Sequence, residues 1–119
     1  MGKLDGGWVV ASESCAFDLV GAEFIRDVKP GEMLVFEDDY AEPKSMMWSK
    51  EMPSKCAHCI FEYVYFARTD SVIDKQCVYQ ARINMGRELA KETKEIHPDI
   101  VISVPDSGTA AAVGYSLES

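Results

Sequence analysis

The sequence is poor in positive charge and histidine, and it has no long apolar run. Its 119 residues contain 12 Lys and Arg against 20 Asp and Glu, a formal net charge of −8. Phosphate groups attract basic surface, so this balance argues against general binding to nucleic acid or to an anionic membrane. The longest strongly apolar stretch, 59–67, contains Glu62 and falls far short of the ~20 residues that a membrane-spanning helix needs.

We expect neither an export signal nor a disulfide framework. Residues 1–7 (MGKLDGG) hold no apolar stretch of signal-peptide length. The 4 cysteines are unevenly spaced, so free thiols or metal ligands are expected rather than disulfides. We therefore expect a cytoplasmic protein that is neither secreted nor inserted in a membrane.

The first third of the chain carries signals for short strands and a short helix. Residues 8–11 (WVVA) follow the turn-forming residues 5–7 (DGG), which predicts a strand after a hairpin-like turn. Residues 15–20 follow cap-type residues and precede Gly21, which predicts a short helix that ends at the glycine.

A Pro-Gly turn marks the next segment. Residues 29–32 (KPGE) predict a turn that joins strands at 23–28 and 33–36 into an antiparallel hairpin. Residues 38–55 mix acidic residues, prolines and lysines with a few apolar residues, and this shift in composition predicts a loop or linker at a domain boundary.

The second half alternates between strand and helix signals. The aromatic and β-branched run 60–66 predicts a strand. Apolar residues at helical spacing predict a helix from 78 to about 95, and the run 99–105 (DIVISVP) is typical of a strand buried on both faces. A turn at 106–109 and a helix at 110–117 follow. This order is typical of an α/β sheet, and one strand with one helix cannot close such a sheet, so we expect a part of a larger protein.

Two clusters carry residues that are able to do chemistry. Cys56, His58 and Cys59 form a Cys-x-x-Cys pair with an adjacent histidine, which suits half of a zinc site, part of an iron–sulfur site, or ordinary thiols. The second cluster is the turn before the last helix, where Asp106 and Ser107 either bind an anion and a hydrated magnesium ion or simply cap the helix.

Several segments, in the same order along the chain, resemble one enzyme family. They are residues 6–16 (GGWVVASESCA), 21–32 (GAEFIRDVKPGE), 59–68 (CIFEYVYFAR), 70–74 (DSVID) and 104–108 (VPDSG). These segments are similar to the middle of the amidophosphoribosyltransferases, the glutamine phosphoribosylpyrophosphate amidotransferases that catalyse the first step of purine synthesis.

The resemblance implies a two-domain enzyme of which this chain is a fragment. Residues 1–55 correspond to the C-terminal part of an α+β glutaminase domain of the N-terminal nucleophile class. Residues 56–119 correspond to the junction and the first elements of an α/β type I phosphoribosyltransferase domain. The complete enzyme releases ammonia from glutamine and passes it to phosphoribosylpyrophosphate, giving phosphoribosylamine. It is expected to form homo-oligomers.

The resemblance assigns two positions and no catalytic residue. Cys59 matches the first of four cysteines that hold a [4Fe–4S] cluster in some members, and Ser107 matches a position that contributes to Mg²⁺ and phosphoribosylpyrophosphate binding. The catalytic cysteine and the acidic phosphate loop have no match here, and 38–39 (DD) lacks the flanking pattern of that loop. The chain alone is therefore expected to be inactive.

Three turn positions depart from the family pattern. Thr69 and Ser103 stand where proline is usual, and Lys75 stands where glycine is usual. Two other hypotheses remain beside the enzyme fragment. One is a small metal-binding or interaction module built on Cys56, His58 and Cys59, and the other is a regulatory stub that joins full-length subunits.

Overall fold

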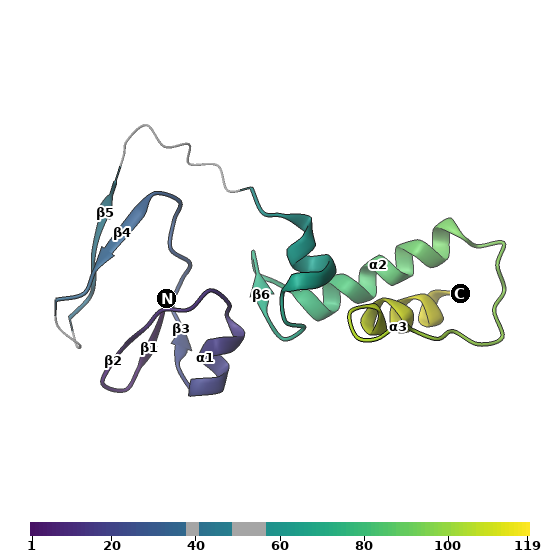
Figure 1. Ribbon diagram of the computed structural model, residues 1–119, viewed down its shortest axis with the longest axis horizontal. Helices are drawn as coiled ribbons and strands as arrows, with labels where there is room; N and C mark the ends of the chain where they lie inside the picture. Colours follow the sequence, from purple (N-terminus) through teal and green to yellow (C-terminus); the bar gives the residue numbers. More distant parts are fainter. Residues whose placement is uncertain (38–40, 49–56) are drawn as a thin grey trace. The chain divides into compact units, whose positions relative to one another are not determined.

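The computed structural model describes residues 1–37, 41–48 and 57–119, which form a mixed α/β chain. The chain divides into two compact units, Met1–His58 and Cys59–Ser119 (Figure 1). From the sequence we placed a domain boundary after residue 55. The assignment of the two halves to a glutaminase and a phosphoribosyltransferase domain stays a prediction.

The first unit contains a small antiparallel sheet. Strands β1 (Gly2–Leu4), β2 (Gly7–Val9) and β3 (Glu23–Phe24) lie in the order β2-β1-β3. Gly6 has a φ of 95°, a backbone conformation that a residue with a Cβ rarely adopts, and this permits the tight reversal between β1 and β2. The turn and strand predicted at this point are confirmed, although the strand is shorter than expected.

Helix α1 (Cys15–Val20) supplies the core of this unit. Gly21 ends the helix in the left-handed region with a φ of 71°, as predicted from the sequence. Phe17 is 2% exposed, and its ring lies 5.7 Å from the ring of Phe24 on β3. The helix is thereby packed on the sheet through one aromatic pair.

A separate two-stranded sheet follows, and it corrects two predictions. Strand β4 (Glu32–Val35) pairs with β5 (Lys44–Met47), in the register Glu32 with Met47 and Val35 with Lys44. The predicted hairpin of 23–28 with 33–36 is wrong, because β3 takes β1 as its partner. The predicted loop at 38–55 is wrong at β5; residues 38–40 and 49–56 lie outside the described part.

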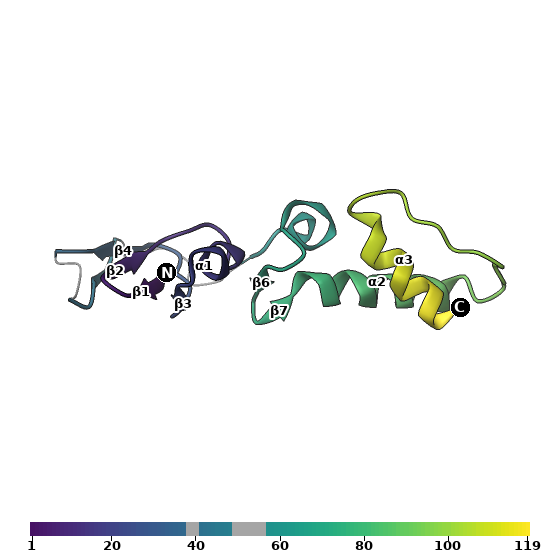
Figure 2. The same ribbon diagram turned by 90° about the horizontal axis from the view of Figure 1, so that it is seen from below.

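The second unit is mainly helical. It begins with η1 (Glu62–Phe66), a short π-helix, continues through a hairpin of β6 (Val72–Ile73) and β7 (Gln76–Cys77), and ends with α2 (Val78–Glu92) and α3 (Gly108–Glu118). The two long helices pack against each other, as both views show (Figures 1 and 2). Both helices were predicted from the sequence, which placed the end of α2 near residue 95, three residues beyond its observed end.

Glycines allow the close approach of α2 and α3. A Cβ at Gly86 would lie 1.9 Å from the carbonyl oxygen of Ala111, and a Cβ at Gly114 would lie 1.9 Å from that of Ile83. Each helix therefore presents a glycine to the backbone of the other. The helices could not pack at this distance with any larger residue at either position.

Two predicted strands of this unit are wrong. The run 60–66 forms a helical segment, in which the Ala67 amide donates to the Glu62 carbonyl at 3.0 Å, five residues back. The run 99–105 is irregular, and three of its apolar side chains are exposed, Ile100 by 78%, Ile102 by 86% and Val104 by 82%. A strand requires a paired neighbour, and none of the described strands lies beside this run. None of the described helices combines the length and apolar character needed to cross a bilayer.

Candidate functional site

Cys59 is the first residue of the second unit, and it lies three residues before η1 begins at Glu62. Its thiol is exposed, and its carbonyl accepts a hydrogen bond from the Glu62 amide at 3.1 Å. Of the other described cysteines, Cys15 is buried in the first unit, and the thiol of Cys77 lies 3.8 Å from the carbonyl oxygen of Thr69. The described residues thus offer one accessible thiol at this point.

The fit to an iron–sulfur cluster or a zinc ion is correspondingly limited. A [4Fe–4S] cluster takes four thiolates and a structural zinc ion takes four ligands. Within residues 1–37, 41–48 and 57–119, no three His, Cys, Asp or Glu side chains come together in a way that could hold a metal. Cys59 can provide one ligand of a larger set. The metal-binding module is not supported, and Cys56 lies outside the described residues.

Ser107 is the residue that precedes the first turn of α3. Its backbone is already helical, with φ −63° and ψ −30°, and its side chain makes no capping hydrogen bond. The simple explanation of Ser107 as a side-chain cap is therefore wrong. The adjacent Asp106 is exposed and accepts a bond from the Thr109 amide through its backbone carbonyl at 3.2 Å. The hydroxyl and the carboxylate are both available to a ligand.

These two residues suit part of a magnesium site. Mg²⁺ takes oxygen ligands and usually keeps several waters, with one or two protein carboxylates and the phosphates of the substrate. Asp106 and Ser107 offer oxygen atoms beside the N-terminus of α3, where the helix dipole favours negative charge. They offer part of such a coordination set, and water and phosphate oxygens would have to supply the rest.

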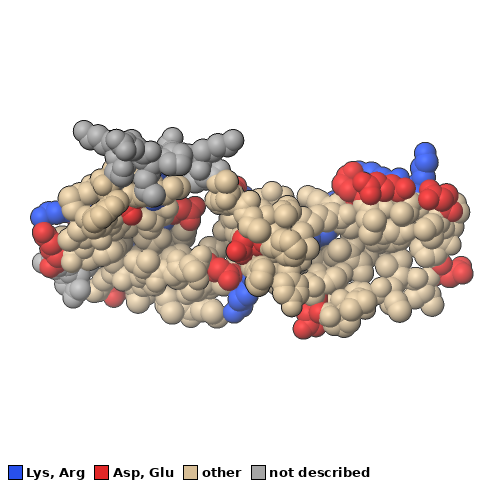
Figure 3. Space-filling model, turned by 45° about the horizontal axis from the view of Figure 1, so that its top comes forward, with Lys and Arg blue, Asp and Glu red and all other residues tan. Residues whose placement is uncertain are grey.

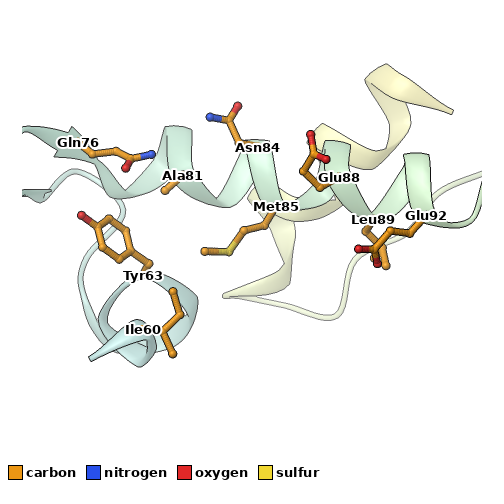
Figure 4. A pocket seen from close by; sticks show the side chains of 9 residues that line it. All are labelled: Ile60, Tyr63, Gln76, Ala81, Asn84, Met85, Glu88, Leu89 and Glu92. Atoms are coloured by element: carbon orange, nitrogen blue, oxygen red, sulfur yellow. The ribbon is translucent and has the colours of Figure 1, made fainter. Parts of the chain in front are cut away.

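An open groove of about 650 Å³ runs along α2 (Figure 4). Ile60 and Tyr63 face it from the η1 side, opposite Met85 and Leu89 of α2. The Tyr63 hydroxyl donates to the carbonyl of Ile73 at 2.8 Å, and burial raises the pKa of this phenol. A largely apolar lining of this kind favours packing of an apolar group over acid–base chemistry.

A dense electrostatic cluster in the first unit is structural. Arg26 donates two hydrogen bonds to the carboxylate of Glu32, at 2.7 and 2.8 Å, and the Ser45 hydroxyl and the Lys29 amide donate to it at 2.5 and 2.8 Å. These bonds, with the Arg26 charge, hold the pKa of Glu32 far below its usual range. Glu32 has no capacity left for a substrate, and the cluster fastens the turn to β5.

Charged side chains elsewhere form no continuous basic surface on the face seen in Figure 3. Acidic groups lie at several separate places on that face, and the described Lys and Arg side chains are scattered among them. The expectation that no nucleic acid binds stays a prediction.

The sequence analysis did not predict that one charged residue is buried. Arg82 of α2 is 5% exposed, and it donates hydrogen bonds to the carbonyl of Tyr63 in η1 and to the carbonyl of Ala67, the residue after η1. The signal was present, since Val78, Arg82, Gly86 and Ala90 recur every four residues and all are buried. A charged residue within an apolar stripe requires buried partners, and those partners are not visible in a sequence.

No protein-family model matches the sequence. Two amidophosphoribosyltransferases, from Mycobacterium tuberculosis (strain H37Rv) and Archaeoglobus fulgidus, are 50% and 49% identical to it over 119 residues, the whole of this chain. The chain is homologous to a segment of the amidophosphoribosyltransferases. It spans 21% and 25% of the length of these two relatives, and the resemblance expected from the sequence is confirmed. The amidophosphoribosyltransferase of Drosophila melanogaster is 47% identical over 113 residues.

Solved structures agree with the amidophosphoribosyltransferase assignment. A glutamine phosphoribosylpyrophosphate amidotransferase from B. subtilis, complexed with ADP and GMP, is 46% identical and superimposes with a TM-score of 0.79. The match covers 90% of this chain and 22% of that one. A structure described as the allosteric regulatory enzyme of purine biosynthesis matches with the same values.

Proposed function

We propose that this chain forms the junction between the glutaminase and phosphoribosyltransferase halves of an amidophosphoribosyltransferase. One observation carries the proposal: identity of 49–50% to enzymes of this name runs through all 119 residues and so through both units. The first unit would be the end of an N-terminal nucleophile glutaminase domain. The second would be the start of a type I phosphoribosyltransferase domain.

The complete enzyme would act in the cytoplasm, as a homo-oligomer, on glutamine and phosphoribosylpyrophosphate. Ammonia released from the glutamine amide would displace pyrophosphate from the sugar, and phosphoribosylamine would form. This reaction is the first step of purine biosynthesis. None of the residues assigned here is a nucleophile or an acid–base group for either half, so we expect the 119-residue chain alone to be inactive.

Within that enzyme, Ser107 and Cys59 would be the ligand-binding residues of this segment. A bound Mg²⁺ supplies charge neutralisation for a phosphate leaving group. Ser107 would orient the pyrophosphate through its hydroxyl, which makes no capping bond, at the N-terminus of α3. Cys59 would be one ligand of a [4Fe–4S] cluster, a role that its exposed thiol permits.

A chimeric enzyme tests the proposal. The 119 residues would replace the aligned segment of the Archaeoglobus fulgidus enzyme, which matches over the same length. We expect the chimera to form phosphoribosylamine from either glutamine or ammonia. A chimera that folds but forms no phosphoribosylamine with either nitrogen source would contradict the proposed function.

Two variants of the chimera test the assigned residues. Ser107→Ala is expected to raise the KM for phosphoribosylpyrophosphate by about 10- to 100-fold, the value of one lost hydrogen bond to a charged group. Cys59→Ser is expected to remove bound iron, measured by metal analysis and visible absorption. Cys77→Ser is the matched control, because this thiol already contacts the Thr69 carbonyl and has no assigned ligand.

A further inference from the structure

The groove along α2 presents side chains at the spacing that one helix offers to another. The α2 residues that line it form two rows with a spacing of four residues, Ala81, Met85 and Leu89 in one row and Asn84, Glu88 and Glu92 in the other (Figure 4). Rows at this spacing are the ridges against which a second helix packs. From residue 81 to residue 92 they extend over about 16 Å, the length of three helical turns.

Hydrogen bonds within the second unit hold the opposite wall of the groove in place. Ile60 and Tyr63 form this wall. Arg82 donates to the Tyr63 carbonyl at 2.6 Å, and the Tyr63 hydroxyl donates to the Ile73 carbonyl at 2.8 Å. The groove is therefore formed before a partner enters it, and a partner that binds a preformed groove pays less for the ordering of side chains and loops.

The exposed side chains of the groove define the chemistry of the partner that fits. Met85 and Leu89 are 37% and 50% exposed, so an apolar partner would remove apolar surface from water. The polar row is acidic, and none of the nine lining residues is Lys or Arg. Lys91 pairs with Glu88 at 2.8 Å, whereas Glu92 forms no ion pair with any residue that the structure describes. The partner that fits is an amphipathic helix with apolar side chains one turn apart and a Lys or Arg beside Glu92.

The described helices of this chain do not have that composition. Neither α1 nor α3 contains a Lys or Arg. A second copy of α2 would place Glu88 of one copy near Glu88 of the other, and like charges in a contact oppose association. A small ligand also fits poorly, because ligand pockets enclose most of their ligand and this groove is open along α2.

The length of the relatives favours a segment of the same polypeptide. The chain spans 21% and 25% of two amidophosphoribosyltransferases, so the larger part of such an enzyme lies outside these residues. A covalently linked segment acts at a high effective concentration, which a separate protein does not. We propose that the groove along α2 holds an amphipathic helix from the part of the enzyme outside these 119 residues, with a basic side chain of that helix beside Glu92. The inference rests on the proposed function.

Oxidation of Met85 tests whether the groove is covered in the enzyme. The 119-residue chain and the chimeric enzyme described above are treated with hydrogen peroxide, and methionine sulfoxide at Met85 is measured by peptide mass spectrometry. We expect Met85 to be oxidised on the order of 10- to 100-fold more slowly in the folded chimera than in the folded 119-residue chain. Both proteins are expected to give the same rate when they are unfolded in urea.

The other possible partners give different results in this experiment. Equal rates in the two folded proteins would overturn the proposal and leave the groove to a separate protein. Slow oxidation in a 119-residue chain that is dimeric by light scattering would also overturn it, because a second copy would then cover Met85. An unsubstituted chimera that folds, protects Met85 and forms no phosphoribosylamine with either nitrogen source would instead contradict the proposed function.

A charge reversal tests the basic side chain of the docked helix. In the chimera, Glu92→Lys is expected to lower the Tm by about 2–4 °C more than Glu95→Lys, because it sets two positive charges against each other. Glu95 is the matched control, since it is exposed, lies three residues further along the chain and does not line the groove. In the 119-residue chain the two variants are expected to have equal Tm values. Equal Tm values in the chimera as well would overturn the assignment of a basic side chain beside Glu92.

Discussion

The contact between α2 and α3 depends on two glycines, and replacing either one by alanine tests the packing directly. A Cβ at Gly86 would lie 1.9 Å from the Ala111 carbonyl oxygen and 2.7 Å from its carbonyl carbon. Atoms in contact prefer separations near 3.5 Å, so the helices would have to part by about 1.5 Å. The obstacle is backbone, which cannot rotate away as a side chain can.

The expected magnitude follows from two opposing effects. Overpacking of a core costs typically about 1–3 kcal/mol, and a backbone obstacle places Gly86→Ala at the upper end. Alanine gains about 1 kcal/mol over glycine in a helix interior. The net loss of unfolding free energy is therefore about 2 kcal/mol, which for a unit of this size lowers the Tm by about 8–16 °C. Gly114→Ala is expected to behave alike, since its Cβ would meet the Ile83 carbonyl.

Thermal unfolding followed by circular dichroism at the helical band measures this effect. Gly108→Ala is the matched control in α3, because a Cβ there would meet nothing within 4 Å. It is expected to leave the Tm unchanged or slightly higher. The double variant Gly86→Ala/Gly114→Ala is expected to lose less than the sum of the single losses, because the first substitution already separates the helices. Equal Tm values for Gly86→Ala and Gly108→Ala would refute the close helix contact.

Two further predictions concern turns and charge. Lys75 has a φ of 65°, a backbone conformation that is strained for a residue with a Cβ. Lys75→Gly is therefore expected to raise the unfolding free energy of the second unit, measured in urea, by about 0.5–1 kcal/mol. A lower unfolding free energy would contradict the strain. Because the pKa of Glu32 is lowered in the folded state, the unfolded state binds its proton first as the pH falls below the ordinary value of 4.5. The stability that Glu32 contributes is thus fully present above that pH and is lost below it. Glu32→Gln is expected to flatten the acid limb of the curve of unfolding free energy against pH for the first unit. An unchanged acid limb would show that Glu32 does not cause the loss of stability in acid.

The three α-helices, α1, α2 and α3, were the part of the fold that local sequence signals predicted well. The apolar stripe of α2 and the glycine that ends α1 act within a few residues, so their effect is visible in the sequence. Strand partners were not visible in the same way. The turn at 29–32 was expected to return β4 to residues 23–28, whereas β4 pairs with the later strand β5 and the ion pair of Arg26 with Glu32 spans the turn instead.

The run 60–66 shows how context overrides composition. Its aromatic and β-branched residues favour a strand only on a pleated surface beside other strands. The unit supplies no such neighbour among its described strands, and it supplies the guanidinium of Arg82 at the helix end. The helical conformation therefore satisfies backbone groups that a lone strand would leave unpaired.

For the candidate site, too, the sequence predicted what depends on neighbouring residues. The identity of Cys59 and Ser107 as ligand-type residues came from motifs, which are contiguous words in a sequence. The sequence alone likewise determined the acidic charge, the two long helices and the family to which this segment is homologous. Only the tertiary structure decided that Arg82 holds η1, that Gly86 and Gly114 set the distance between α2 and α3, and that β5 is the partner of β4. Those contacts join residues far apart in the chain, and their energies depend on which atoms meet in space rather than on the order in which they are linked.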